Sequence, residues 1–265
     1  MDFKILIPSY GRAIILKKKT LALLERHNVP KNNIYIFLQD NEQFIDYELD
    51  QEYNVIITGA EGIENTRNYL QDWVYSSDLT RVLHIDDDIL NITDTEGKSL
   101  ENFIEFTKEL LNDIDKAGLG IGGICAYSNK FYLKDTTSKS LKYIIGAFRA
   151  EIVRRDRPIV KCSFSHFEDV QFTCEYFKRD GGVYRKNGYG LKTLYFNPNG
   201  GIIGSMGGLQ ERQRAMDMNS KAMVHLYPNM VRIVYKKIGV DLRLNHHYKN
   251  DITIEMNKDV NKVCV

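Results

Sequence analysis

The chain has 265 residues, of which 43% are hydrophobic and 11% aromatic, which is enough for one substantial core. Its 36 Lys and Arg residues nearly balance its 35 Asp and Glu residues, and the net charge of +1 excludes a strong overall positive field for nucleic acid. No apolar stretch is long enough to span a bilayer, and the four scattered cysteines lack CxxC spacing, so we predict a protein of a reducing cytoplasm with no membrane partner.

The first half of the chain alternates short apolar runs with amphipathic segments. The runs predict strands at residues 3–7, 33–38, 55–57 and 82–85. The segments between and after them predict helices at residues 13–26, 64–75 and 99–118. The last of these helices is expected to be capped by Ser99 and ended by Gly118. Alternation of this kind predicts an α/β fold with a mostly parallel central sheet and helices on both faces.

The second half is less regular. A Gly-rich segment leads into an apolar run through Cys125, and further strands are expected at residues 142–153 and 189–196, with a helix at 167–179 between them. A polar, Gly-rich segment follows at 197–214, and residues 231–244 are apolar and basic by turns. We place no firm domain boundary in the chain.

Three consecutive aspartates, Asp86, Asp87 and Asp88, follow the apolar run 81–85. Adjacent carboxylates repel one another and fit poorly inside a strand, whereas open α/β sheets bind ligands at the carboxyl ends of their strands. In strand geometry Asp86 and Asp88 would point to one side and Asp87 to the other. Such oxygen donors suit Mg²⁺ or Mn²⁺ on a diphosphate, and the alternative is a solvated acidic turn.

Two loops near predicted strand ends have residues suited to a nucleotide. The first loop comprises Pro8, Ser9, Tyr10, Gly11 and Arg12. Tyr10 could stack on a nucleobase and Arg12 could reach a phosphate. In the second loop Gly62 permits close backbone approach at a helix N-terminus, which favours anions, and Arg67 follows in the first turns. Each loop also fits an ordinary turn or a plain helix cap.

The pair Glu168 and Asp169 lies between aromatic residues near the start of a predicted helix. Burial by Phe167 and Phe172 would raise the pKa of one carboxyl toward the range in which it can take a proton from a substrate hydroxyl. The alternative is an acidic first turn of a helix, since Asp and Glu suit that position.

Taken together, these segments resemble the GT-A family of nucleotide-sugar glycosyltransferases. The matching pieces occur in the family's order over the N-terminal two-thirds of the chain: the strand ending in Ile-Pro-Ser-Tyr-Gly-Arg, the Gly62-Ile63…Arg67-Asn68 segment, the aspartate triplet and the Glu168-Asp169 pair. The resemblance implies one GT-A (Rossmann-like) domain over residues 1–265, with a nucleotide-sugar half at 1–130 and a C-terminal acceptor half at 131–265.

The resemblance also implies roles for individual residues. Asp86 and Asp88 are expected to hold Mn²⁺ or Mg²⁺ on the diphosphate of a UDP-sugar. Asp169, with its neighbour Glu168, is the candidate base that deprotonates the acceptor hydroxyl. The expected donor-binding residues are Pro8, Ser9, Tyr10, Arg12, Gly62, Arg67, Asp86 and Asp87.

A histidine could complete the metal site. GT-A enzymes often add one C-terminal histidine to the metal shell, and this makes His225 the first candidate, ahead of His246 and His247. For any one of these residues the alternative is an ordinary structural histidine. His84, inside a predicted strand, is expected in the core.

The C-terminal third is similar to phage glycosyltransferases that modify DNA bases, including the TET-associated glycosyltransferases. This likeness implies a hydroxymethylated pyrimidine in DNA as the acceptor, and the host cytoplasm as the location if the chain is phage-encoded. Basic residues after the Gly-rich segment would then contact phosphates. The expected acceptor-binding residues are Arg212, Arg214, Arg232, Lys236 and Lys237.

Other functions remain open at this point. Within the class, the acceptor could be a glycan or a lipid-linked sugar, although no membrane segment supports this. A nucleotidyltransferase also pairs aspartates around Mg²⁺, but it calls for a Gly-rich phosphate loop with a lysine after the first strand, which residues 8–11 lack. A DNA-binding module would have no use for Asp86 and Asp88. The sequence leaves the sugar, the stereochemical course and the oligomeric state open.

Overall fold

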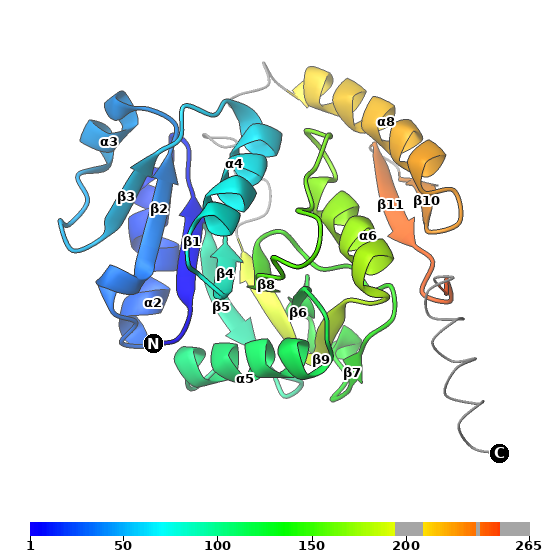
Figure 1. The fold of residues 1–265 in the computed structure, drawn as a ribbon, viewed down its shortest axis with the longest axis horizontal. Helices are drawn as coiled ribbons and strands as arrows, with labels where there is room; N and C mark the ends of the chain where they lie inside the picture. The colour runs from blue at the N-terminus through cyan, green and yellow to red at the C-terminus, as the bar shows by residue number, and fades with distance from the viewer. Residues whose placement is uncertain (194–208, 237–238, 250–265) are drawn as a thin grey trace.

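The computed structural model describes residues 1–193, 209–236 and 239–249, and most of its strands form one large sheet (Figure 1). The strand order is β3-β2-β1-β4-β8-β6-β9-β5, and β7 pairs with β9. The bounds are β1 Lys4–Pro8, β2 Ile34–Leu38, β3 Asn54–Ile57, β4 Arg81–Ile85, β5 Ile89–Thr93, β6 Ile121–Cys125, β7 Thr137–Ser138, β8 Phe148–Ile152 and β9 Tyr184–Thr193. Strands β1, β2, β3, β4, β6 and β9 share one direction, while β5, β7 and β8 run the opposite way.

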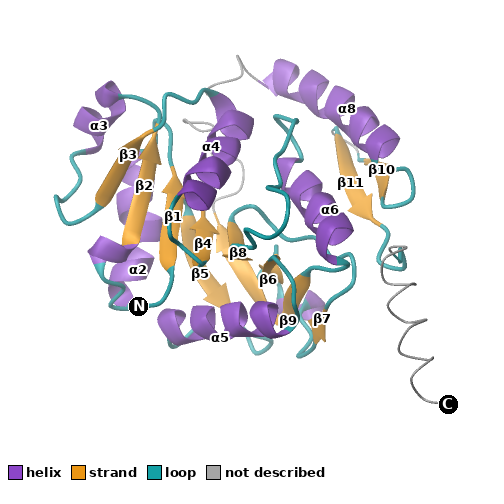
Figure 2. Ribbon diagram, in the orientation of Figure 1, coloured by secondary structure: helices purple, strands orange, loops and turns teal. Residues whose placement is uncertain are grey.

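Helices cover both faces of this sheet (Figure 2). The apolar side chains of β1 alternate between the faces, so that Ile5 and Ile7 pack in one core cluster and Leu6 in another. The first cluster includes residues of the helix at 13–26 and of α5, and the others include residues of α4 and α6. The predicted α/β fold is therefore confirmed. The bounds are α1 Ala13–Leu16, α2 Ala22–Arg26, α3 Asn41–Tyr47, α4 Gly62–Ser76, α5 Phe103–Lys116 and α6 Glu168–Asp180, with short helical turns η2 Lys31–Asn33 and η3 Lys130–Tyr132.

The C-terminal part adds a helix and a hairpin beside α6 (Figure 1). Helix α8 (Leu209–Leu226) packs on β10 (Val231–Tyr235) and β11 (Val240–Leu244), which pair antiparallel as a separate two-stranded sheet. Met223, Tyr227 and Val231 share a core cluster with Phe172 and Phe177 of α6. The hairpin is thereby fixed to the same helix that begins with Glu168.

Several elements differ from the sequence-based prediction. The strand expected at 142–153 begins only at Phe148, and the strand expected at 189–196 is β9, which starts earlier and is described up to Thr193. Helix α5 is capped by the side chain of Asn102, which accepts a hydrogen bond from the Glu105 amide, and not by Ser99. Strand β5 and the helices α3 and α8 were not predicted, and α8 overlaps the segment expected to be a polar loop.

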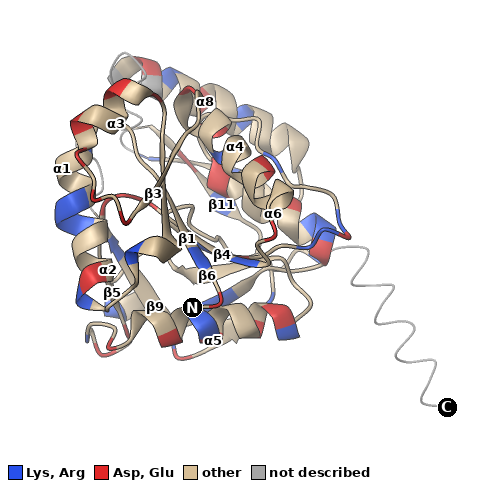
Figure 3. Cartoon of the chain, turned by 60° about the vertical axis from the view of Figure 1, so that its left-hand side comes forward, with Lys and Arg blue, Asp and Glu red and all other residues tan. Residues whose placement is uncertain are grey.

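The surface carries basic and acidic residues together, as their nearly equal numbers suggest. Figure 3 shows acidic and basic residues intermixed over the helices of the face it presents. Among the helices in the described ranges, none combines the length and the apolar character that crossing a membrane requires.

Candidate active site

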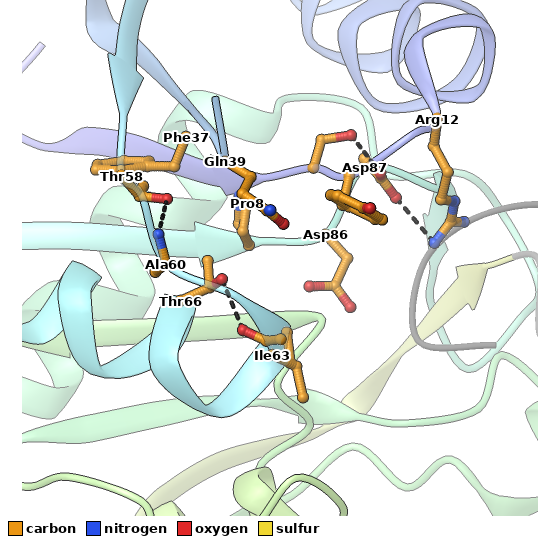
Figure 4. Close-up of a pocket in the computed structure, with 13 residues that line it drawn as sticks. Pro8, Arg12, Phe37, Gln39, Thr58, Ala60, Ile63, Thr66, Asp86 and Asp87 are labelled. Carbon is orange, nitrogen blue, oxygen red and sulfur yellow. Dashed lines mark hydrogen bonds and ion pairs between the residues drawn. The ribbon is translucent and has the colours of Figure 1, made fainter. Parts of the chain in front are cut away.

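A cavity of about 130 Å³ lies at the carboxyl ends of β1, β2, β3 and β4 (Figure 4). Its lining residues are Pro8, Ser9, Tyr10, Arg12, Phe37, Gln39, Thr58, Ala60, Gly62, Ile63, Thr66, Asp86 and Asp87. All the predicted donor-binding residues except Arg67 are in this lining, and Arg67 contacts Asp86 from behind it. The predicted donor-binding residues, which follow strands far apart in the sequence, therefore lie together in the folded chain.

The aspartate triplet is a turn between β4 and β5, and strand geometry ends at Ile85. Thr20 fixes this turn: its hydroxyl donates to the Asp86 carbonyl at 2.7 Å and accepts from the Ile89 amide at 2.9 Å. Thr20 lies in η1 (Lys17–Leu21), a π-helical turn that interrupts the predicted helix at 13–26. Such turns occur frequently at functional sites.

Arg12 neutralises two of the three aspartates. Its guanidinium lies 2.6 Å from Asp88 and 3.2 Å from Asp87. The Asp87 carboxylate also accepts a hydrogen bond from Ser9 at 2.5 Å, and the Ser9 hydroxyl is 2.7 Å from that of Tyr47. Burial raises the pKa of Asp87 to about 7 despite the opposing effect of Arg12. Asp87 is thus held inside the site, with Ser9 and Arg12 on its two oxygens.

Asp86 instead faces the cavity and is paired with Arg67. One Asp86 oxygen lies 2.6 Å from Arg67, and the Asp86 side chain keeps 33% of its exposure, against 3% for Arg67. Figure 4 shows Asp86 between Arg12 and the start of α4 at Ile63. That start requires glycine at Gly62, whose φ of +79° is unfavourable for other residues.

Arg67 also connects the cavity to the predicted Glu168-Asp169 pair. Burial opposes its charge, but the nearby carboxylates of Asp86, Glu168 and Asp169 keep its pKa raised. Gly146 allows this convergence: a Cβ there would lie 3.2 Å from the Cβ of Asp169, 3.4 Å from Arg67 and 3.6 Å from Glu168. Both predicted carboxylate groups therefore lie near one buried guanidinium.

Glu168 and Asp169 differ in their surroundings. Asp169 accepts hydrogen bonds from the Tyr143 hydroxyl and from the amides of Gly146 and Val170. The Glu168 carboxylate accepts a hydrogen bond from its own backbone amide, and its pKa is raised by burial and by the adjacent Asp169. Phe167, which precedes the pair, has a φ of +64°, a backbone conformation that costs energy for a bulky residue and is often found at functional sites.

The donor chemistry of Asp86 and Asp88 fits a hard divalent cation. Burial and then the charge of Asp86 raise the pKa of Asp88, so the two carboxylates repel each other, and a cation between them would relieve this repulsion. The described residues contain no group of three His, Cys, Asp or Glu side chains arranged to hold an ion. His225 is exposed at the end of α8 and does not join the two aspartates in such a group, because α8 packs on the β10–β11 hairpin.

The structure describes three of the five predicted acceptor-binding side chains, those of Arg214, Arg232 and Lys236. Arg214 on α8 and Arg232 on β10 are exposed, whereas Lys236 lies 2.5 Å from Asp241. Lys237 and the side chain of Arg212 lie outside the described residues.

A second polar cluster is buried below the site, between the sheet and helices α4 and α6. The Glu151 carboxylate of β8 accepts hydrogen bonds from Gln71 at 2.9 Å and Tyr176 at 2.6 Å, and it lies 3.0 Å from His84. Arg149 is 3.9 Å from Glu151 and stacks over the Phe172 ring. The predicted burial of His84 is confirmed, with an exposed fraction of 0%.

Sequence reasoning missed several residues of the site. Tyr143 and Gly146 reach the Asp169 carboxylate, Thr20 bonds to the backbone of the aspartate turn and Tyr47 contacts Ser9, all from segments that carry no recognisable motif. Gln39 and Thr58 follow β2 and β3, so their position just after predicted strands was the one signal that could have found them.

No family model and no curated protein matches this sequence. Solved structures with a similar arrangement include a mannosyltransferase from Pyrobaculum calidifontis in complex with GDP-Man and Mn²⁺ (TM-score 0.47, 10% identity, 84% of this chain and 64% of that one). Others are glucosyl-3-phosphoglycerate synthase from Mycobacterium tuberculosis (0.46, 10%, 96% and 91%) and 4-diphosphocytidyl-2C-methyl-D-erythritol synthase from Anaerococcus prevotii (0.39, 13%, 77% and 93%). This chain spans less than two thirds of the mannosyltransferase, and likenesses this distant assign it to no family.

Proposed function

We propose that this protein is a glycosyltransferase that uses a divalent cation to move a sugar from a nucleotide sugar to a hydroxyl acceptor. The observation that carries the proposal is the position of Arg67. This one buried guanidinium is paired with Asp86 at the cavity and lies near the Glu168-Asp169 pair, so a donor diphosphate and a proton-accepting carboxylate can meet around it. The proposal treats residues 1–265 as one domain with donor and acceptor halves.

The cavity supports binding of a nucleoside at one end and of phosphates at the other. Pro8 and Phe37 supply an apolar wall for a base, and Gln39 and Thr58 can hydrogen-bond to its edge. Arg67 supplies positive charge next to this end of the cavity from behind Asp86, and its buried Nη1 has no hydrogen-bond partner among the described residues. UDP is the nucleotide that the sequence predicts.

Asp86 and Asp88 are the residues proposed to hold Mn²⁺ or Mg²⁺. An ion there would supply positive charge against the leaving diphosphate. The diphosphate and water would provide the remaining oxygen ligands, since protein sites for Mg²⁺ commonly use one or two carboxylates together with substrate phosphates.

We propose Glu168 as the proton acceptor, with Asp169 as its positioning partner. The acceptor oxygen bonds to the anomeric carbon of the sugar, the bond from that carbon to the diphosphate breaks with its electron pair, and the acceptor proton goes to a Glu168 oxygen. Asp169 is less suited to take the proton because Tyr143, Gly146 and Val170 already hydrogen-bond to its oxygens.

The hydroxymethylated DNA base predicted from the sequence is a narrower proposal for the acceptor. Exposed Arg214 and Arg232 support it among the described residues, while Lys236 is engaged by Asp241. A titration of hydroxymethylated duplex over a salt series tests it: DNA binding should weaken steeply with salt, because each neutralised phosphate releases counterions.

The function itself is tested by product analysis. The protein is incubated with Mn²⁺ and either a panel of nucleotide sugars or nucleoside triphosphates with sugar phosphates. Release of nucleoside diphosphate from one nucleotide sugar is expected. Release of pyrophosphate from a triphosphate would instead show a nucleotidyltransferase, and the absence of both products would contradict either enzyme.

A further inference from the structure

Arg185 of β9 differs from the other arginines that are at least half-buried. Within the described ranges, each of the others has a carboxylate within 4 Å, as Arg12, Arg67 and Arg179 do. Arg185 has none. Its Nε donates to Asn187 at 2.8 Å and its Nη1 to the Tyr143 carbonyl at 3.4 Å, which leaves Nη2 without a partner among these residues. The guanidinium is therefore held in place without being neutralised.

Lys142 lies beside Arg185 and is also unpaired within the described part of the chain. It is half-buried and directly precedes Tyr143, the residue whose carbonyl accepts the hydrogen bond from Arg185. His246 approaches the same segment, with its Nδ1 2.8 Å from the Leu141 carbonyl, and the two cations lower its pKa further. The other titratable neighbour, Cys125, has its thiol pKa raised by burial, so it brings no negative charge. Within the described part of the chain, Arg185 and Lys142 therefore have no paired carboxylate.

The pKa shifts agree with this geometry. Carboxylates raise the pKa of Arg12 and Arg67 despite burial, whereas burial lowers that of Arg185. Burial and Arg185 together lower the pKa of Lys142. Burial disfavours the charge of both residues, and each is stabilised when an anion binds beside it.

This pair of cations lies one tyrosine side chain away from the candidate proton acceptor. Arg185 contacts the Tyr143 carbonyl, and the Tyr143 hydroxyl contacts Asp169 next to Glu168. A ligand with its anionic group on Arg185 could therefore extend along Tyr143 toward Glu168. The donor cavity lies on the other side of Arg67.

We propose that Arg185 and Lys142 form an anion subsite that binds a phosphate monoester carried by the acceptor. That the bound phosphate monoester is a sugar acceptor rests on the proposed function, whereas the anion subsite does not depend on it. A small phosphorylated acceptor fits better than duplex DNA, because the two cations are half-buried, whereas a DNA backbone needs a track of exposed cations. Arg185 supplies a directed N–H group and Lys142 a point charge, a combination suited to phosphate oxygens.

The test measures the reactivity of Lys142 directly. The full chain is acetylated with a limiting reagent at neutral pH, alone or with inorganic phosphate, glycerol phosphate, glycerol or duplex DNA at equal phosphate concentration. Peptide mass spectrometry then gives the acetylated fraction of each lysine. Phosphate and glycerol phosphate should protect Lys142 severalfold, and glycerol should not. Lys31, which is paired with Asp50, serves as the internal control.

Variants assign the protection to the proposed pair. Arg185→Gln should abolish the protection of Lys142, while Arg26→Gln, at an exposed arginine of α2, should retain it. As a second variant, Lys142→Gln should reduce the phosphate-dependent rise in Tm seen with the wild-type protein.

The outcomes separate this proposal from the proposed function. No protection in the wild-type protein, or equal protection in Arg185→Gln, would overturn the subsite. Stronger protection by duplex DNA than by glycerol phosphate would overturn the small acceptor and favour DNA. Protection without turnover of any nucleotide sugar would support the anion subsite while contradicting the glycosyltransferase.

Discussion

Two arginine–carboxylate clusters lie on the same side of the sheet, and they differ in how completely their charges are satisfied. Around Glu151, hydrogen bonds from Gln71 and Tyr176 and the charge of Arg149 hold one carboxylate that is 0% exposed. Around Arg67, the carboxylates of Asp86, Glu168 and Asp169 share one guanidinium, and the Asp86 side chain stays partly exposed. Buried charges that are paired are structural as a rule, whereas repelling carboxylates at a cavity indicate a binding site.

The largest effect is expected at Glu168. Glu168→Gln should lower kcat for sugar transfer by about 10²- to 10⁴-fold, the usual contribution of a proton acceptor. The free energy of unfolding should stay the same or rise, because the change removes one of two adjacent buried carboxylates that repel each other. Single-turnover transfer and urea denaturation measure the two quantities.

A matched control for this variant lies on the same helix. Glu175→Gln should keep kcat, since Glu175 contacts Tyr227 and Lys178 away from Arg67. Full activity of Glu168→Gln would show that another group takes the proton.

Glu151 should give the opposite pattern. Glu151→Gln removes the carboxylate that compensates Arg149 in a buried site, so the free energy of unfolding should fall by about 3–5 kcal/mol. Sugar transfer per folded molecule should change little. If Glu151→Gln were as stable as the wild-type protein in urea denaturation but inactive, the cluster around Glu151 would be functional rather than structural.

A smaller effect is expected from pH. Burial and Arg149 lower the pKa of His84 to about 4 from its ordinary 6.5. Between these values the unfolded chain binds the proton and the folded chain does not, so stability falls as the pH is lowered through this window. The contribution of His84 should be about 1–3 kcal/mol. His84→Gln should make the free energy of unfolding less dependent on pH between 6.5 and 4, as measured by urea denaturation, and an unchanged slope would contradict a buried neutral histidine.

The sequence predicted the parts of the molecule in which local pattern and tertiary structure agree. Apolar runs indicated β1 to β4, and the cavity lies where these runs end in polar residues such as Ser9 and Asp86. The chain reverses at Asp87 and Asp88. Strand β5 follows this turn directly and is too short to show an alternating apolar–polar pattern.

Other features depend on contacts between distant segments. The apolar residues 142–147 suggested a strand, yet they form the loop that brings Tyr143 and Gly146 to Asp169. The choice between Glu168 and Asp169 as proton acceptor depends on these contacts, because only the folded chain shows which oxygens are occupied. Whether His225 can join the aspartates depends on where α8 packs. This could not be predicted from the sequence, because that helix has no marked apolar face.

The most direct test of the central claim is calorimetric titration with UDP, and in parallel with GDP, in the presence and absence of Mn²⁺. The wild-type protein and the exposed-site control Asp72→Asn should bind one of these nucleotides in a Mn²⁺-dependent manner. Asp88→Asn should keep its Tm but lose this dependence, because it removes one of the two carboxylates proposed to hold the ion. Unchanged Mn²⁺-dependent binding in Asp88→Asn would contradict the assignment of the aspartate turn as the donor site.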